Sequence, residues 1–193
     1  DARIDGHVVF VHGALRGEKC RVLILKTLKS VAFAKVLEVI EPSSERITPD
    51  CPYFPRCGGC TYRHMSYEEE LRLKKQRVQD NLARIGGSAV VVEEILGAAD
   101  TLRYRNKAQY PVAEQDGKAV CGFYSRRSHH VCDHTDCALQ PAVFKAIADE
   151  IMAYVNERKI KAYNEETGSG LLRHIYLRRG EHSGEIMVCL VIN

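Results

Sequence analysis

The sequence predicts an α+β protein in two parts: a small N-terminal β-barrel or sheet, then a mixed α/β domain with antiparallel hairpins and two helices. Three observations carry this prediction. The first 42 residues alternate like short strands, two later segments repeat apolar residues at helical spacing, and Asp-Gly and Ser-Gly turns separate apolar runs. A polar stretch at 42–49 with two prolines separates domain 1–42 from domain 43–193.

In the N-terminal part, three segments have strand-like alternation: Gly6–Val11, Lys19–Leu25 and Val31–Ile40. The linker 12–18 contains two glycines, which suit tight turns. Short strands joined in this way are typical of a small barrel or sheet.

Two helices are expected in the second part. Ser66 and Glu69 have the spacing of a capping box, and Gly86-Gly87 provides a left-handed end to the first helix. The second is predicted over Pro141–Lys159. The residues expected to face inward are Leu71, Val78, Leu82 and Ile85 in the first helix, and Phe144, Ile147, Ile151 and Val155 in the second.

Two hairpins complete this part. Tyr110–Ala113 and Ala119–Tyr124 flank Asp116-Gly117, and 171–178 pairs with 185–192 around Ser183-Gly184. The run Ile186–Ile192 is β-branched and apolar, which predicts a buried strand. Because the sequence starts at Asp1 rather than Met, we expect the natural N-terminus to be absent. Because it stops just after this apolar run, we expect domain 43–193 to be truncated at its C-terminus.

The composition is that of a soluble globular protein, with 45% hydrophobic and 27% charged residues. No apolar run is long enough for a membrane span, and no secretory signal is visible, so no membrane partner and a cytoplasmic location are expected. The net charge of +3 permits an RNA partner without demanding one.

Eight cysteines are present, and three of them form the motif Cys51-x5-Cys57-Gly-Gly-Cys60. Clustered cysteines without a secretory signal indicate metal ligands, and the glycines leave amide groups free to point at sulfur. A fourth ligand would come from Cys132 or Cys137. Three ligands together and one far away favour a 4Fe–4S cluster; a zinc site and ordinary reduced cysteines are the alternatives.

The remaining cysteines, Cys20, Cys121 and Cys189, are expected in the core, and His129, His130 and His134 on the surface.

Several motifs together resemble the RNA (uracil-5-)-methyltransferases, which make 5-methyluridine in ribosomal or transfer RNA. They are the Cys51–Cys60 run, Tyr104-Arg-Asn-Lys107, Gly122-Phe-Tyr124 and Cys137-Ala-Leu139. Segment 5–18 looks like the TRAM domain that opens many of these enzymes. The resemblance implies a TRAM-like, OB-like barrel, here incomplete at its first strand, then a cluster-binding domain, then a methyltransferase domain. It also implies Cys51, Cys57, Cys60 and Cys137 as the four cluster ligands.

The chain departs from that scheme because it shows no glycine-rich loop for S-adenosylmethionine. Segment Thr167–Gly170 leads into a strand and is expected to be a loop. The family's nucleophilic cysteine and general base would lie beyond residue 193, so no catalytic residue is assigned here, and S-adenosylmethionine belongs to the full-length enzyme only. The fragment alone is expected to be inactive. The alternative hypotheses are a stand-alone zinc-stabilised RNA-binding module and a redox-sensing RNA-binding protein.

Three basic clusters with a tyrosine could contact single-stranded RNA or a loop uridine, because cations neutralise phosphates and rings stack on unpaired bases. They lie at 103–107, 124–127 and 173–179. The alternative is an ordinary solvated sheet surface. The expected RNA contacts are Arg105, Asn106, Lys107, Arg127, Arg173 and Arg178.

Overall fold

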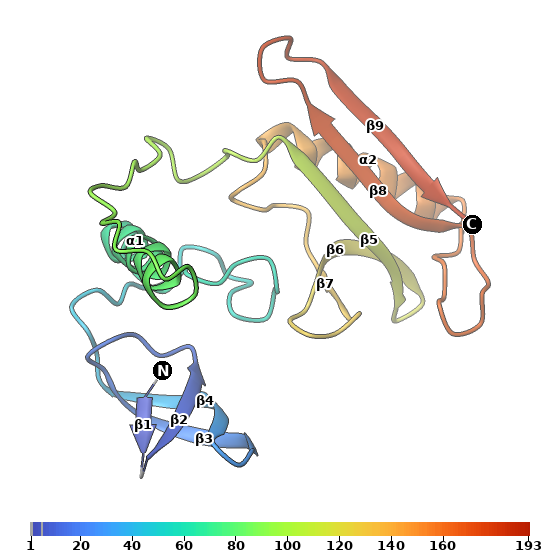
Figure 1. Ribbon diagram of the computed structural model, residues 1–193. Helices are drawn as coiled ribbons and strands as arrows, with labels where there is room; N and C mark the ends of the chain where they lie inside the picture. The colour runs from blue at the N-terminus through green and yellow to red at the C-terminus, as the bar shows by residue number, and fades with distance from the viewer. Residues whose placement is uncertain (1, 5) are drawn as a thin grey trace. The chain divides into compact units, whose positions relative to one another are not determined.

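The computed structural model describes residues 2–4 and 6–193, and it has the predicted α+β composition, with mostly strands and two helices among those residues. The chain divides into two compact units (Figure 1). The first unit contains residues 1–50 and 62–96, and the second contains residues 51–61 and 97–193. The cysteine loop therefore leaves the first unit to join the second. The predicted division at residue 42 stays a prediction.

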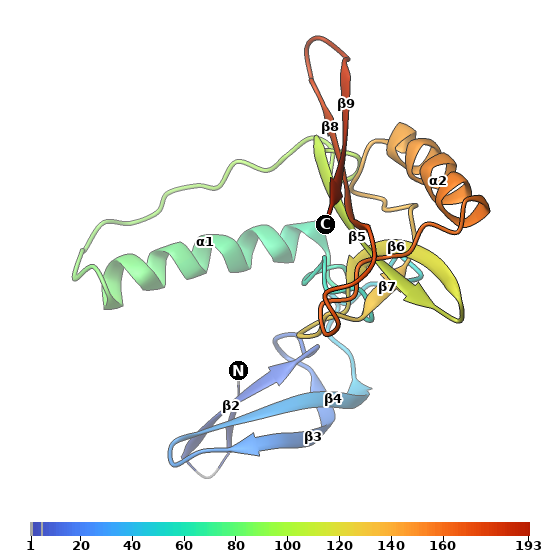
Figure 2. The same cartoon turned by 90° about the vertical axis from the view of Figure 1, so that its right-hand side faces the viewer.

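The first unit contains a four-stranded sheet, in which β2 and β4 pair in parallel and the other neighbours pair antiparallel (Figure 2). The strands are β1 (Ala2–Ile4), β2 (His7–His12), β3 (Lys19–Thr27) and β4 (Val31–Glu41), in the order β1-β2-β4-β3. Three strands match the predicted segments, and β1 is additional. The sheet is open, because β1 and β3 lie at opposite edges and do not pair within the described residues. The sheet is therefore not a closed barrel, and the expected incomplete TRAM-like, OB-like barrel stays a prediction. The core of this sheet is small: Val9, Ala32 and Ala34.

Helix α1 (Tyr67–Arg84) begins and ends where the sequence predicted. Ser66 accepts the Glu69 backbone N–H at 3.2 Å, but the Glu69 carboxylate bonds to Arg72 at 2.6 Å, so only half of the capping box forms. Gly87 follows the helix with a φ of 59°. The predicted inward face is only partly covered, since Val78 and Ile85 are exposed.

The second unit contains an antiparallel five-stranded sheet with α2 (Ala142–Glu157) against one face (Figures 1 and 2). Its order is β7 (Val131–Asp133), β6 (Lys118–Tyr124), β5 (Lys107–Gln115), β8 (Leu172–Arg179) and β9 (Ile186–Ile192). Both predicted hairpins form. In the first, Asp116 and Gly117 have φ values of 49° and 76°, which is the geometry of a two-residue hairpin turn.

The core of this unit lies between α2 and the middle strands. Phe144 and Val155 are buried in it as predicted, and Ile147 and Ile151 pack at its border. Among the described residues, neither helix is long and apolar enough to span a bilayer.

The prediction that Ile186–Ile192 is buried is wrong, because all seven residues of β9 are exposed. The strand is an edge that pairs only with β8, and the core under α2 takes its side chains from β5, β6 and β8. Cys189 on β9 is consequently exposed rather than in the core. Cys121 is buried as expected, and Cys20 is half-buried.

Candidate functional site

The loop 51–61 is fixed to the end of β6 by backbone contacts. Cys57 forms an isolated bridge with Ser125, and the Gly58 N–H donates to the Tyr124 carbonyl at 2.9 Å. The Arg126 guanidinium donates to the Cys60 carbonyl at 2.9 Å. These contacts hold the three cysteines of the motif beside the sheet.

The two glycines of the motif have different roles. A Cβ atom on Gly58 would lie 2.8 Å from the Tyr124 carbonyl oxygen, so only glycine allows this close approach. A Cβ atom on Gly59 would meet only Cys57 Sγ, at 3.5 Å. The Gly59 N–H instead donates to that sulfur at 3.4 Å, as predicted for an amide that points at a ligand.

The Cys137 segment is held by the chain just before β5. Arg103 has a φ of 55°, and its guanidinium donates to the Cys137 and Gln140 carbonyls, each at 2.9 Å. The Arg103 and Arg105 backbone N–H groups donate to the carbonyls of Ala138 and Leu139. Arg103 and Arg105, both from the basic cluster 103–107, therefore hold the Cys137 segment in place.

These two segments meet at one cavity, which we call the cluster cavity. It is small, with a volume of about 30 Å³. The lining residues are Cys51, Phe54, Cys57, Gly59, Cys60, Arg105, Phe123, His134, Cys137 and Leu139. Cys137 thus joins the three motif cysteines. Cys132 is buried on β7 opposite Phe123 and does not line the cavity.

Four cysteine thiols are a donor set that both a zinc ion and a 4Fe–4S cluster take. Among the residues that the structure describes, no three His, Cys, Asp or Glu side chains are close enough together to hold a metal ion.

The surroundings of the cysteines are mostly apolar. Burial raises the pKa of the Cys57 thiol; the Gly59 N–H lowers it, and the neighbouring Cys132, Cys60 and Cys137 raise it further. Cys57 is therefore held as a neutral thiol until a cation compensates the charge of its thiolate. The donor set fits an iron–sulfur cluster.

Two polar side chains other than cysteine line the cavity: Arg105 and His134. His134 is only 6% exposed, so the prediction of a surface histidine is wrong. Its ring stacks on Tyr53 with centroids 4.1 Å apart, and it meets Phe123 at 5.4 Å. Burial lowers the pKa of His134, which favours the neutral ring. No local sequence signal distinguishes it from His129 and His130.

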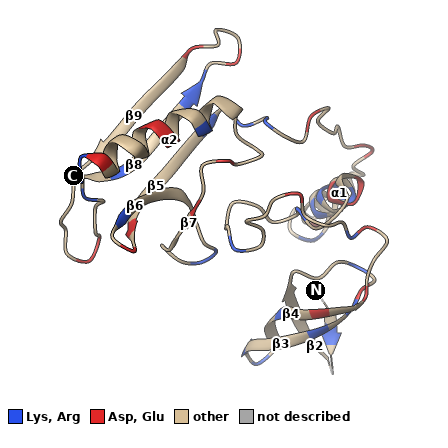
Figure 3. Cartoon of the chain, turned by 180° about the vertical axis from the view of Figure 1, so that it is seen from behind, with Lys and Arg blue, Asp and Glu red and all other residues tan. Residues whose placement is uncertain are grey.

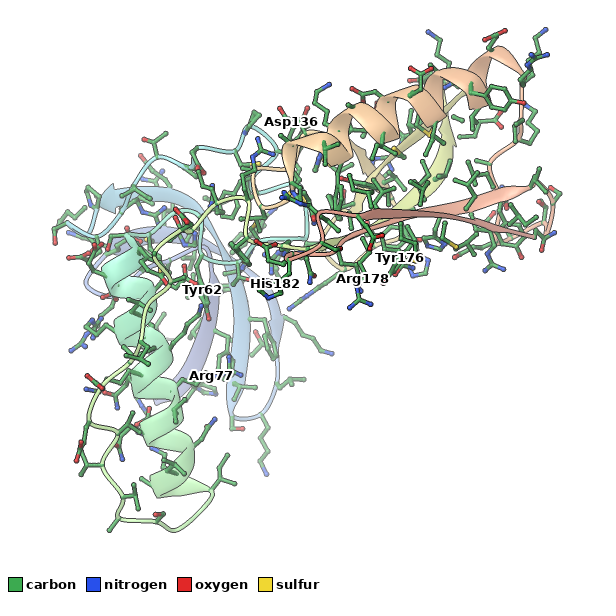
Figure 4. All side chains as sticks on the ribbon, turned by 90° about the horizontal axis from the view of Figure 1, so that it is seen from above. Tyr62, Arg77, Asp136, Tyr176, Arg178 and His182 are labelled. Atoms are coloured by element: carbon green, nitrogen blue, oxygen red, sulfur yellow. The ribbon has the colours of Figure 1, made fainter. Side chains whose placement is uncertain are left out.

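On the sheet face opposite α2, Lys107 and Arg178 lie directly across from one another, and we call them the basic pair. Figure 4 shows Arg178 and Tyr176 on the side of β8 that faces away from α2. Lys107 Nζ lies 5.6 Å from the centroid of the Tyr176 ring. The ion pairs described in this unit involve neither member of the basic pair. In Figure 3 this end of β8 is basic, whereas α2 carries both signs of charge.

Directly opposed like charges destabilise a sheet, so folding alone does not favour the basic pair. Asn106 is exposed beside Lys107, and its carbonyl accepts the Arg179 N–H at 2.8 Å. The structure thus brings Asn106, Lys107 and Arg178 together. Arg105 is separate from them, because it lines the cluster cavity.

The other two expected RNA residues lie elsewhere in the second unit. Arg127 is exposed in the turn after β6. Arg173 lies over the Tyr163 ring at 4.2 Å and lines an open groove of about 850 Å³. The same groove contains Tyr124, whose ring stacks on His129 at 5.2 Å. Tyr163 was missed in the sequence because it lies outside the basic clusters.

The curated relatives found by sequence comparison are named RNA methyltransferases. No protein-family model matches the chain. It is 41% identical over 191 residues to an uncharacterised RNA methyltransferase of Halalkalibacterium halodurans, and 41% identical over 194 residues to one of Clostridium acetobutylicum. These alignments cover 98% and 99% of this chain but 42% of each relative. The chain thus spans less than half the length of the curated relatives it matches.

A solved structure has a similar fold: the tRNA (uracil-54, C5)-methyltransferase of Pyrococcus abyssi in complex with S-adenosyl-L-homocysteine. The TM-score is 0.69 at 22% identity, over 96% of this chain and 42% of that one. The similarity at this identity is one of fold. The curated relatives confirm the expected resemblance to RNA methyltransferases.

Proposed function

We propose, from the premise that this chain is a partial member of the RNA methyltransferase family, that it supplies the cluster-binding and RNA-recognition part of a uracil-5 methyltransferase. The full-length enzyme would transfer a methyl group from S-adenosylmethionine to a uridine of ribosomal or transfer RNA, forming 5-methyluridine. This chain would contribute no catalytic residue and would be inactive alone. It would act in the cytoplasm.

The observation that carries the proposal is the cluster cavity. Cys51, Cys57 and Cys60 reach it from one segment, and Cys137 reaches it from another, 77 residues further along the chain than Cys60. A shared 4Fe–4S cluster would join these segments covalently and would contribute directly to folding. S-adenosylmethionine would supply the methyl group from a site in the rest of the enzyme; the S-adenosyl-L-homocysteine bound by the Pyrococcus abyssi protein supports this part of the proposal.

RNA recognition would use two surfaces of the second unit. The basic pair and Asn106 would contact phosphates, since both cations lack described acidic partners. Tyr124, Tyr163 and Arg173 would stack on unpaired bases in the open groove. The TRAM-like character of segment 1–42 is part of the same proposal.

The test is anaerobic purification followed by iron, sulfide and zinc analysis and a visible absorption spectrum. We expect a brown protein with about four irons per chain. Cys137→Ala should lose the brown colour. Cys189→Ser is the matched control and should keep it, because Cys189 is exposed on β9 and does not line the cavity.

A colourless protein with one zinc per chain would contradict the proposal and favour a zinc-stabilised RNA-binding module. Cluster oxidation that changes RNA affinity while the fold persists would instead favour a redox-sensing RNA-binding protein. Loss of folding on oxidation is the result that the proposal predicts.

A further inference from the structure

His134 is a buried imidazole whose two ring nitrogens have no hydrogen-bond partner in the part of the chain that the structure describes. Buried polar atoms are nearly always paired, and a native exception calls for an explanation such as a bound ion or group. Other buried atoms without a partner, such as Tyr110 Oη and the Gln140 amide, belong to residues that do not line the cluster cavity. His134 does line it, together with the four cysteines.

The ring is held in place from three sides. The His134 backbone N–H donates to the Cys121 carbonyl at 3.1 Å, which anchors the residue at the end of β7. Tyr53 stacks on the ring at 4.1 Å and belongs to the cysteine loop itself. Phe123 tilts against the ring at 5.4 Å. A fixed ring between two aromatic side chains keeps its N–H in one direction.

A water molecule is a poor partner for this ring. A buried water needs two to four polar groups around it. The cavity offers apolar walls, the sulfurs and Arg105. Thiolate and sulfide sulfurs bear negative charge and accept hydrogen bonds, and a charged acceptor strengthens the bond.

We propose that His134 donates a ring N–H hydrogen bond to a sulfur of the 4Fe–4S cluster and thereby raises the reduction potential of the cluster. The inference rests on the proposed function, since it requires the cluster to be present. A donor stabilises the reduced cluster more than the oxidised cluster, because the reduced form carries one more negative charge. His134 acts as a tuning residue and not as a ligand.

The first experiment compares reduction potentials in His134→Phe and wild-type protein. One electron from dithionite enters the cluster, and no proton is transferred. Phenylalanine preserves the aromatic stack on Tyr53 and removes the N–H. We expect a potential more negative than that of the wild type with unchanged iron content, and no change in His130→Phe, whose side chain is exposed outside the cavity. Equal potentials in all three proteins would overturn the inference.

The second experiment needs no folded variant. Wild-type protein labelled with ¹⁵N-histidine is reduced and studied by pulsed electron paramagnetic resonance. We expect one weak nitrogen coupling, as for a nitrogen that is hydrogen-bonded to sulfur. A strong coupling would make His134 a ligand, and no coupling would place it away from the cluster; both results contradict the inference. Wild-type protein without iron would instead overturn the proposed function, and this inference with it.

Discussion

Two buried polar sites, one in each unit, differ in how their hydrogen bonds are completed. In the first unit, the Glu18 side chain is fully buried and accepts bonds from Arg46 at 2.8 Å, from the Leu15 N–H at 2.7 Å and from the Ser43 N–H at 3.4 Å. In the second unit, His134 lines the same cavity as four cysteines, and its two ring nitrogens have no hydrogen-bond partner among the described residues.

The difference is the one that we expect between a structural site and the proposed ligand site. The protein alone satisfies Glu18, because buried charges are stable where paired and hydrogen-bonded. Arg46 also donates to the Gly13 carbonyl at 2.7 Å, so this ion pair joins the strand linker to the chain after β4. Among the described residues, the protein provides no hydrogen-bond partner for the His134 ring nitrogens at the cluster cavity. We therefore expect the second unit, and not the first, to depend on a bound group.

Removal of the cluster should produce the largest effect. Treatment with an iron chelator and an oxidant should unfold the region around the cluster cavity, because metal binding contributes to folding there. Amide hydrogen exchange should increase strongly in residues 51–61 and 131–140. Exchange in β2 and β4 should stay unchanged; equal loosening of both units would contradict the comparison.

Loss of the Glu18 carboxylate should have the next largest effect. Glu18→Ala leaves the Arg46 guanidinium and two amides without their acceptor, and we expect a loss of about 2–4 kcal/mol in the free energy of unfolding of the first unit. Chemical denaturation followed by circular dichroism measures this. The control is Lys19→Gln, which breaks an exposed pair with Glu41 and should cost less than about 1 kcal/mol.

The same carboxylate should make the first unit sensitive to acid. Burial would raise the pKa of Glu18, but hydrogen bonds from Arg46, Leu15 and Ser43 lower it from 4.5 to about 2. A lowered pKa means that this contribution to stability is full above pH 4.5 and is lost as the pH falls toward 2. Glu18→Gln should lose stability at neutral pH and show a flatter dependence in this window. Parallel acid curves for the variant and the wild type would contradict this assignment.

Alanine substitutions at the two motif glycines, Gly58 and Gly59, should differ in how much bound iron they leave. Gly58→Ala places a Cβ atom 2.8 Å from the Tyr124 carbonyl and should displace the cysteine loop, with a cost of about 1–3 kcal/mol and less bound iron. Gly59→Ala meets only the Cys57 sulfur, at an ordinary distance of 3.5 Å, and should retain its iron. Iron content per chain measures both, and equal iron loss would show that the close approach to Tyr124 is unimportant.

The smallest effect should come from the basic pair. Lys107→Ala should weaken RNA binding by about 1 kcal/mol, since one phosphate contact is lost. The slope of the logarithm of the binding constant against the logarithm of the salt concentration should become shallower by about one. Lys145→Ala on α2 is the control, because Lys145 pairs with Asp149 on the other side of the sheet. Unchanged RNA affinity and an unchanged salt dependence in Lys107→Ala would show that the basic pair does not contact RNA.

Local signals in the sequence predicted most elements. The Asp116-Gly117 turn and the Ser66 cap depend on neighbouring residues, so both form where predicted. Burial depends on partners far along the chain. The β9 residues resemble a core strand but form an edge, and His134 resembles a surface residue but lies among aromatic rings.

The candidate site shows the same limit. The Cys51–Cys60 spacing identified three cysteines, whereas the choice between Cys132 and Cys137 needed the resemblance to a family. The position of Arg105 at the cavity depends on the backbone hydrogen bond from its N–H to the Leu139 carbonyl, which residue type and charge do not encode. The same arginine therefore resembled a phosphate contact in the sequence.

The central claim is that Cys51, Cys57, Cys60 and Cys137 hold one 4Fe–4S cluster. Iron and sulfide content after anaerobic purification of Cys137→Ala and Cys132→Ala tests it most directly, because only the first residue lines the cavity. We expect Cys137→Ala to lose the cluster and its brown colour, whereas Cys132→Ala should keep about four irons per chain. Full iron in Cys137→Ala with loss in Cys132→Ala would contradict the ligand set, and an iron-free wild type would contradict the site itself.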